Sequence, residues 1–106
     1  MQVVVDMAAA PTTVVLSEPA DCGRFHVAVR GSGDAGTLDQ ALRADGVGSV
    51  DGDGEALVRV DAVRRLAAGA VGETWDHDFA AMLDYARSKG WLSDDGASIR
   101  AHVEWG

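Results

Sequence analysis

Residues 75–105 read WDHDFAAMLDYARSKGWLSDDGASIRAHVEW, and this stretch decides the expected fold. In its first half the apolar side chains recur every three or four residues, at Trp75, Phe79, Met82, Leu83 and Ala86. This spacing forms one stripe of an α-helix, with charged residues on the opposite side. Thr74 is the expected N-cap, and Gly90 suits the left-handed position just past a helix end. The pattern predicts an amphipathic helix over about residues 75–89.

The last seven residues of the stretch alternate with a period of two. Apolar side chains occupy every second position: Ile99, Ala101, Val103 and Trp105. Arg100, His102 and Glu104 lie between them, which predicts a strand with one buried and one solvated face. We expect the helix stripe to pack on the buried face of this strand. Trp75, Trp91 and Trp105 are interpreted as core aromatics, because large aromatic side chains dominate protein cores.

The remainder of the chain predicts short strands and two short helices. Valine-rich or alternating runs predict strands at 2–7, 12–16, 25–31, 47–50 and 56–60. The capping-box spacing of Thr37 and Gln40 predicts a helix over 38–44, and Asp61 is the expected cap of a helix over 62–68. The residues Asp51-Gly52-Asp53-Gly54 predict a hairpin turn.

These elements together predict an α+β fold. We expect a mainly antiparallel sheet, with the two short helices and the long helix of residues 75–89 packed on one face. A chain of 106 residues has the length of one globular domain, so residues 1–106 are assigned to a single domain.

Composition excludes several classes of partner. The formal net charge is −8, which disfavours nucleic acid and anionic membrane, since both require a basic surface. Cys22 is the single cysteine, so no internal disulfide can form and a reducing compartment is expected. No apolar run approaches about 20 residues, and residues 1–6 do not resemble a signal peptide. A soluble, cytoplasmic protein is therefore expected.

A glycine motif follows the predicted strand at 25–31. Gly31-x-Gly33-x-x-Gly36 matches the spacing of a dinucleotide-binding loop, in which glycines allow backbone amides to approach phosphate. The helix after it is short, and Asp34 within the loop would repel phosphate. A plain glycine loop is the favoured interpretation, and nucleotide binding is the alternative.

Cysteine, histidine and acidic residues supply further candidates. Cys22 and His26 lie four residues apart and could begin a metal site or a thiol nucleophile pair, with His77 and His102 as distant additional ligands. The spacing matches no known zinc motif, so we expect no metal and no cofactor.

Two further patterns could carry chemistry. Arg100, His102 and Glu104 share one strand face and could support acid–base catalysis, although a solvated face is the simpler interpretation. The residues Asp51 to Glu55 resemble the start of a calcium loop but lack its twelfth-position acid, so a hairpin is preferred.

No motif brings together a nucleophile, a base and a stabilising group, so catalysis is not expected. The sequence instead predicts an interaction or accessory domain with a protein partner or a second copy of itself. Trp105 suggests that the last strand is an exposed edge, and we expect a homodimer through that edge or the adjoining helix face. The alternative function is binding of a small molecule or nucleotide by the Gly31–Gly36 loop.

Overall fold

The computed structural model describes residues 1–52 and 54–105, which form six strands and three helices. In chain order these are β1 (Gln2–Asp6), β2 (Thr13–Ser17), β3 (His26–Arg30), α1 (Ala35–Ala44), β4 (Gly48–Val50), β5 (Glu55–Arg59), α2 (Val60–Ala67), α3 (Trp75–Ser88) and β6 (Ser98–Trp105). The α+β class is confirmed. None of the helices in the described ranges combines the length and the apolar character needed to cross a bilayer.

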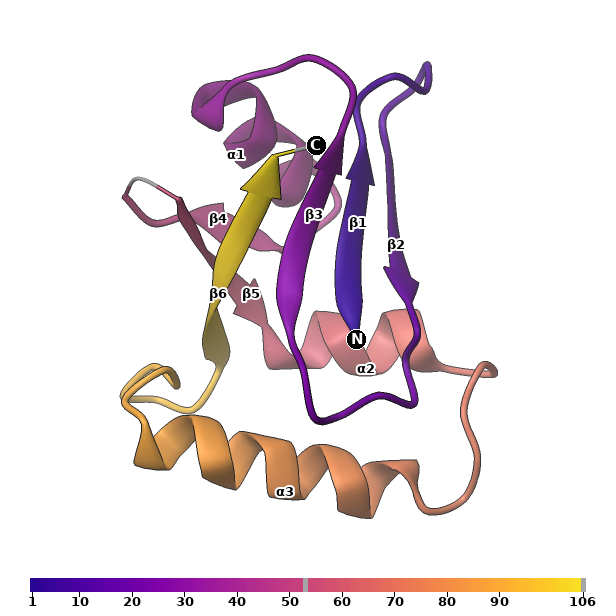
Figure 1. Cartoon of the computed structure of the whole chain (residues 1–106), viewed down its shortest axis with the longest axis vertical. Helices are drawn as coiled ribbons and strands as arrows, with labels where there is room; N and C mark the ends of the chain where they lie inside the picture. Colours follow the sequence, from indigo (N-terminus) through magenta and orange to yellow (C-terminus); the bar gives the residue numbers. More distant parts are fainter. Residues whose placement is uncertain (53, 106) are drawn as a thin grey trace.

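The strands form one curled sheet in the order β2-β1-β3-β6-β5-β4 (Figure 1). Three neighbouring pairs are antiparallel, but β1 with β3 and β3 with β6 are parallel. The expected mainly antiparallel sheet is therefore corrected to a mixed one. The parallel pairs arise because β2 returns the chain to the end where β1 began before β3 starts, and β5, antiparallel to β6, returns it to that end before β6 starts. Parallel neighbours need such long connections.

The position of β6 corrects a second expectation. It lies between β3 and β5 and pairs with both, so it is not an edge strand. Its alternation is confirmed, because Ile99, Ala101 and Val103 are buried whereas Arg100 is exposed on the opposite face. Trp105, at the end of the strand, is 47% exposed and does not belong to the core.

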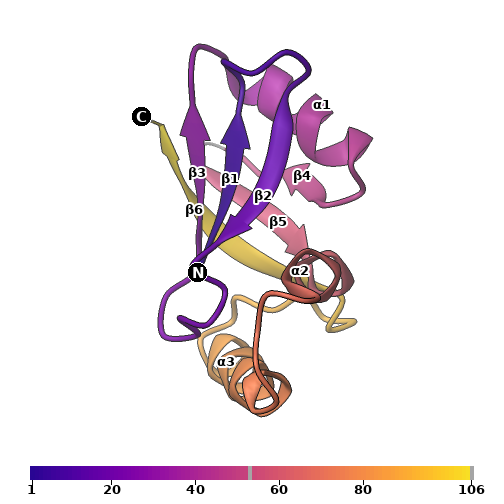
Figure 2. The ribbon, with the colours of Figure 1, turned by 90° about the vertical axis from the view of Figure 1, so that its right-hand side faces the viewer.

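The core lies between the sheet and the two shorter helices. α1 and α2 cover the same face of the sheet, while the other face carries no helix in the described chain (Figure 2). One continuous cluster joins the inward side chains of the strands to those of both helices; among its fully buried members are Val3, Val5, Val27, Val58, Leu38, Leu42 and Val63. Burial of these aliphatic groups is the main favourable term in folding.

Both short helices begin earlier than predicted. α1 starts at Ala35 because the Asp34 carboxylate, rather than Thr37, is its N-cap: Asp34 Oδ1 accepts a hydrogen bond of 2.8 Å from the Thr37 backbone amide. α2 follows β5 directly, with Arg59 at the N-cap position. Asp61 does not cap it and instead forms a 3.0 Å ion pair with Arg59.

α3 confirms the helix predicted over residues 75–89, ending one residue earlier. Gly90 has φ 76°, and its amide donates to the Arg87 carbonyl while the Trp91 amide donates to the Ala86 carbonyl at 2.9 Å. These two bonds form a Schellman motif, which ends the helix and turns Trp91 back toward it. At the other end Thr74 occupies the expected N-cap position, but its side chain makes no capping hydrogen bond.

α3 does not lie on the sheet face; it crosses beneath the end of the sheet where β1, β3 and β6 begin (Figures 1 and 2). The helices on the sheet face are α1 and α2 (Figure 2). Trp75 and Phe79 attach the helix there: both are buried, and their rings stack with centroids 4.7 Å apart. Trp75 Nε1 also donates a 2.7 Å hydrogen bond to the Pro19 carbonyl, and the Arg64 guanidinium of α2 lies 5.0 Å from the centre of the Phe79 ring.

Truncation of Phe79 tests this attachment. Phe79 is fully buried, so Phe79→Ala should lower the free energy of unfolding by about 3–5 kcal/mol, through lost burial and a residual cavity. Asp84→Ala, at an exposed position of the same helix, should change it by less than about 0.5 kcal/mol. Urea unfolding followed by circular dichroism measures both. Equal effects of the two substitutions would show that α3 is not anchored through this ring.

Candidate functional site

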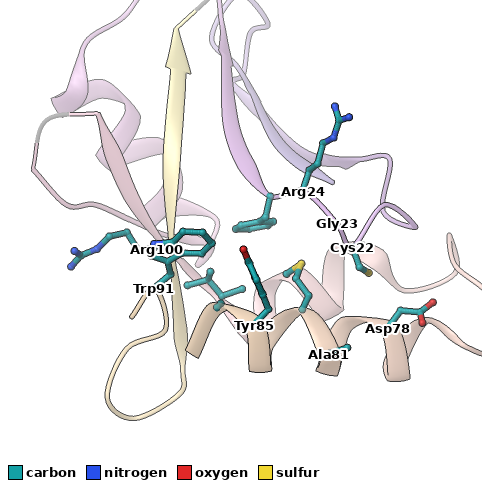
Figure 3. Close-up of a pocket in the computed structure, with 12 residues that line it drawn as sticks. Cys22, Gly23, Arg24, Asp78, Ala81, Tyr85, Trp91 and Arg100 are labelled. Atoms are coloured by element: carbon teal, nitrogen blue, oxygen red, sulfur yellow. The ribbon is translucent and has the colours of Figure 1, made fainter. Parts of the chain in front are cut away.

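A pocket of about 410 Å³ lies between α3, the segment 22–25 that precedes β3, Trp91 and the start of β6 (Figure 3). Its wall is largely apolar. The segment before β3 contributes Cys22 and Phe25, and the first residues of β6 contribute Ile99. Both the size and the apolar lining are typical of sites that bind small molecules.

The wall formed by α3 is a second stripe, next to the one that enters the core. Asp78, Ala81, Met82 and Tyr85 follow the spacing i, i+3, i+4 and i+7, so they share one side of the helix. Met82 also packs against the core cluster, whereas Tyr85 is 56% exposed. The pocket exists because this stripe faces the segment 22–25 across a gap and does not pack tightly against the sheet.

Two exposed aromatic residues stand at one end of the pocket. Tyr85 rises from α3 with its hydroxyl group directed toward the sheet (Figure 3), and Trp91 is 45% exposed. Their rings meet edge to face with centroids 5.8 Å apart. Trp91 reaches this place because the turn at Gly90 reverses the chain. The expectation that Trp91 is a core residue is therefore wrong; of the three tryptophans, only Trp75 is buried.

The charged groups around the pocket are arranged unevenly. Asp78 lies on α3 at the end opposite the aromatic pair, two helical turns from Tyr85 (Figure 3). Arg24 and Arg100 contribute to the lining but carry their guanidinium groups away from it (Figure 3). The Arg100 guanidinium is held instead by Asp51, at 3.0 Å.

The Cys22 thiol is kept in its neutral form. Burial raises its pKa, and the carboxylates of Asp78 and Asp21 raise it further, against an opposing effect of the amino-terminal ammonium group. A thiol with a raised pKa is a weak nucleophile and a weak metal ligand at neutral pH. Cys22 therefore acts as a partly buried apolar wall residue.

The residues considered for acid–base catalysis lie elsewhere. His102 and Glu104 are exposed on the outer face of the sheet, and neither lines this pocket. Glu104 lies 3.5 Å from His26 Nε2, because β3 and β6 pair in a register that sets His26 beside His102. Only Arg100 touches the pocket, at its rim.

The structure does not assemble the metal candidates into a site. Cys22 lines the pocket, whereas His26 lies on the outer sheet face beside Glu104. Within residues 1–52 and 54–105 no three histidine, cysteine or acidic side chains form a group that could hold a metal ion. At the suggested calcium loop, Asp51 pairs with Arg100, β4 and β5 form the predicted hairpin, and Asp53 lies outside the described residues.

Packing against neighbouring segments accounts for glycines in the Gly31–Gly36 loop. A Cβ on Gly31 would lie 2.6 Å from the Ala8 backbone nitrogen, and Gly31 has φ 87°; a Cβ on Gly33 would overlap the Met7 sulfur. The loop therefore needs glycine at Gly31, where it passes the backbone of the turn between β1 and β2, whereas at Gly33 the Met7 side chain would have to move. Asp34 also occupies the first free amides of α1, where a phosphate would have to bind. Gly36 lies beside that carboxylate.

A second, more polar pocket of about 400 Å³ lies near the β4–β5 hairpin. Its two arginines are already neutralised: Arg43 pairs with Asp39 at 2.7 Å and Arg59 with Asp61 at 3.0 Å. This arrangement offers an anion little free positive charge.

The sequence interpretation did not identify Asp78, Ala81, Tyr85 or Trp91 as site residues. A signal was present, because the α3 sequence carries a second stripe beside the core stripe, followed by a tryptophan directly after the glycine stop. Comparisons with protein families, with curated proteins and with solved structures found no match. Function is therefore inferred from the chemistry of this pocket.

The reactivity of Cys22 tests the electrostatics of the pocket. Because the pKa of the thiol is raised, the thiolate fraction should become appreciable only at a higher pH than in a free cysteine. We expect the pH midpoint for alkylation by iodoacetamide to lie above that of a cysteine in an unstructured peptide. Asp78→Asn should move the midpoint downward, since it removes a negative charge that opposes thiolate formation. A midpoint below that of the peptide would contradict this account.

Proposed function

We propose that this protein is a non-catalytic binding domain and that its ligand is a small, largely apolar molecule held in the pocket between α3 and β6. The observation that carries the proposal is an apolar pocket of about 410 Å³ flanked by the half-exposed pair Tyr85 and Trp91. Exposed aromatic side chains that are not needed by the core are characteristic of binding surfaces.

The chemistry of the lining supports binding over catalysis. The pKa of the pocket's thiol, Cys22, is raised, and the three histidines of the chain are absent from the lining. General acid–base catalysis needs a group that titrates near neutral pH within reach of the substrate. The free thiol also supports a reducing compartment such as the cytoplasm.

Filling the pocket tests the proposal. Ala81 lines the pocket from α3, whereas Ala80 is exposed on the same helix outside the lining. We expect 2-phenylethanol, a neutral aromatic probe, to shift the amide resonances of the residues around Tyr85 and Trp91 in a saturable manner. Ala81→Trp should abolish this binding by occupying the space, and Ala80→Trp should preserve it. Resonance shifts that do not saturate, or that persist in Ala81→Trp, would contradict the proposal.

Self-association is a second proposal, supported by the edge of the sheet. β6 pairs with β3 and with β5, so it is not the edge strand that the sequence suggested for the homodimer. β2 is an edge strand that contains no charged residue, and its Val15 side chain is 51% exposed. Natural proteins usually protect such edges with charges, so an uncharged edge favours pairing with another strand. Antiparallel pairing of β2 with β2 of a second copy would extend the sheet across a two-fold axis.

A charge at Val15 tests this dimer. Val15→Lys would place two like charges close together across the two-fold axis and should weaken the dimer by at least about tenfold. His102→Lys adds a similar charge on the interior strand β6 and should leave association unchanged. Sedimentation velocity at increasing protein concentration distinguishes the two. A wild-type protein that stays monomeric throughout would remove the proposal.

A further inference from the structure

The pocket has two chemically different ends. Tyr85 and Trp91 present aromatic rings at one end, and Asp78 presents a carboxylate at the other (Figure 3). Seven residues of α-helix separate Asp78 from Tyr85, which corresponds to roughly 10 Å. A ligand that satisfies both ends therefore has an apolar body of a few carbon–carbon bonds and one polar group.

The carboxylate of Asp78 is available to such a ligand. Asp76, two residues earlier in α3, forms an ion pair with Arg64 at 3.5 Å. Among the described residues, no ion pair or hydrogen bond reaches the Asp78 carboxylate. Its charge acts on the pocket wall, because Asp78 is the largest charged contributor to the raised pKa of Cys22. The negative charge at this end of the pocket is thus not neutralised by a neighbouring side chain.

The basic residues near the pocket do not offset this charge. The guanidinium groups of Arg24 and Arg100 are directed away from the space, and Arg100 is held by Asp51 and lies near Glu55 (Figure 3). Lys89 lies at the aromatic end, with Nζ 5.5 Å from the centre of the Tyr85 ring. Lys89 is thus at the end of the pocket opposite Asp78 and lies over the Tyr85 ring in cation–π geometry.

We propose that the ligand is an organic amine, with its apolar body against Tyr85 and Trp91 and its ammonium group beside Asp78. This inference rests on the proposed binding function and specifies the class of ligand. The formal net charge of −8 favours it further, because the field of an acidic protein raises the local concentration of cations. A carboxylate or phosphate ligand would meet repulsion at the Asp78 end.

Three probes of one shape test the class of ligand: 2-phenylethylamine, its neutral analogue 2-phenylethanol and the anion 3-phenylpropionate. By resonance-shift titration of the wild-type protein we expect the amine to bind about three- to fivefold more tightly than the alcohol, from one exposed ion pair with Asp78. The anion should bind most weakly. Raising the salt concentration should reduce the advantage of the amine, because exposed charges are screened.

Substitution of Asp78 tests whether its carboxylate causes the preference for the amine. Asp78→Asn should reduce the preference for the amine to less than about twofold while leaving 2-phenylethanol binding unchanged. Asp84→Asn makes the same charge change at an exposed position of α3 outside the lining and should retain the preference. Thermal unfolding of both variants confirms that they are folded.

The outcomes separate the two proposals. Equal binding of the amine and the alcohol, tighter binding of the anion, or a preference that survives Asp78→Asn would overturn the amine assignment and leave the apolar binding function intact. Failure of all three probes to bind would overturn both.

Discussion

The burial of Trp75 and Phe79 beneath the end of the sheet is the interaction on which the rest of the structure depends. Their stacked rings join α3 to the core, and the hydrogen bond from the Trp75 indole to the Pro19 carbonyl ties the same helix to the segment that leads into β3. Because one contact positions both walls, the space between them is defined by the fold and not by a mobile loop. The apolar stripe beside Phe79 then faces this space, and the Schellman turn at Gly90 places Trp91 at its mouth.

The interior position of β6 determines where the polar side chains of this strand lie. Since β6 pairs with β3 and β5, its polar side chains form the middle of the outer sheet face, where His102 and Glu104 lie open to solvent. Catalysis in a site so exposed would lack the exclusion of water that strengthens electrostatic interactions. β2 lies at one edge of the sheet, and this is where we propose self-association.

The pocket and the glycine loop illustrate two different uses of small residues. At Gly31, the absence of a side chain is required because the backbone of the turn after β1 passes within contact distance. At Ala81, a small side chain leaves space open, and that space is lined by aromatic and apolar groups. The glycine allows the loop to pack, whereas the small side chain of Ala81 leaves the space in which we propose that the ligand binds. These two roles of a small residue can be distinguished only when it is known which distant segments of the chain are in contact.

The sequence by itself determined the local structure. Periodicity identified α3 and the alternation of β6, glycine chemistry identified the end of α3, and the Asp-Gly turn identified the β4–β5 hairpin, because each depends on residues a few positions apart. Only the tertiary structure decided the parallel pairing of β1, β3 and β6, the position of α3 below the sheet, and the exposure of Trp91 and Trp105. These features depend on contacts between segments far apart in the chain, whose free energies no local pattern encodes. The pocket belongs to this second group, since Cys22, Asp78 and Trp91 become neighbours only when the helix crosses beneath the strands.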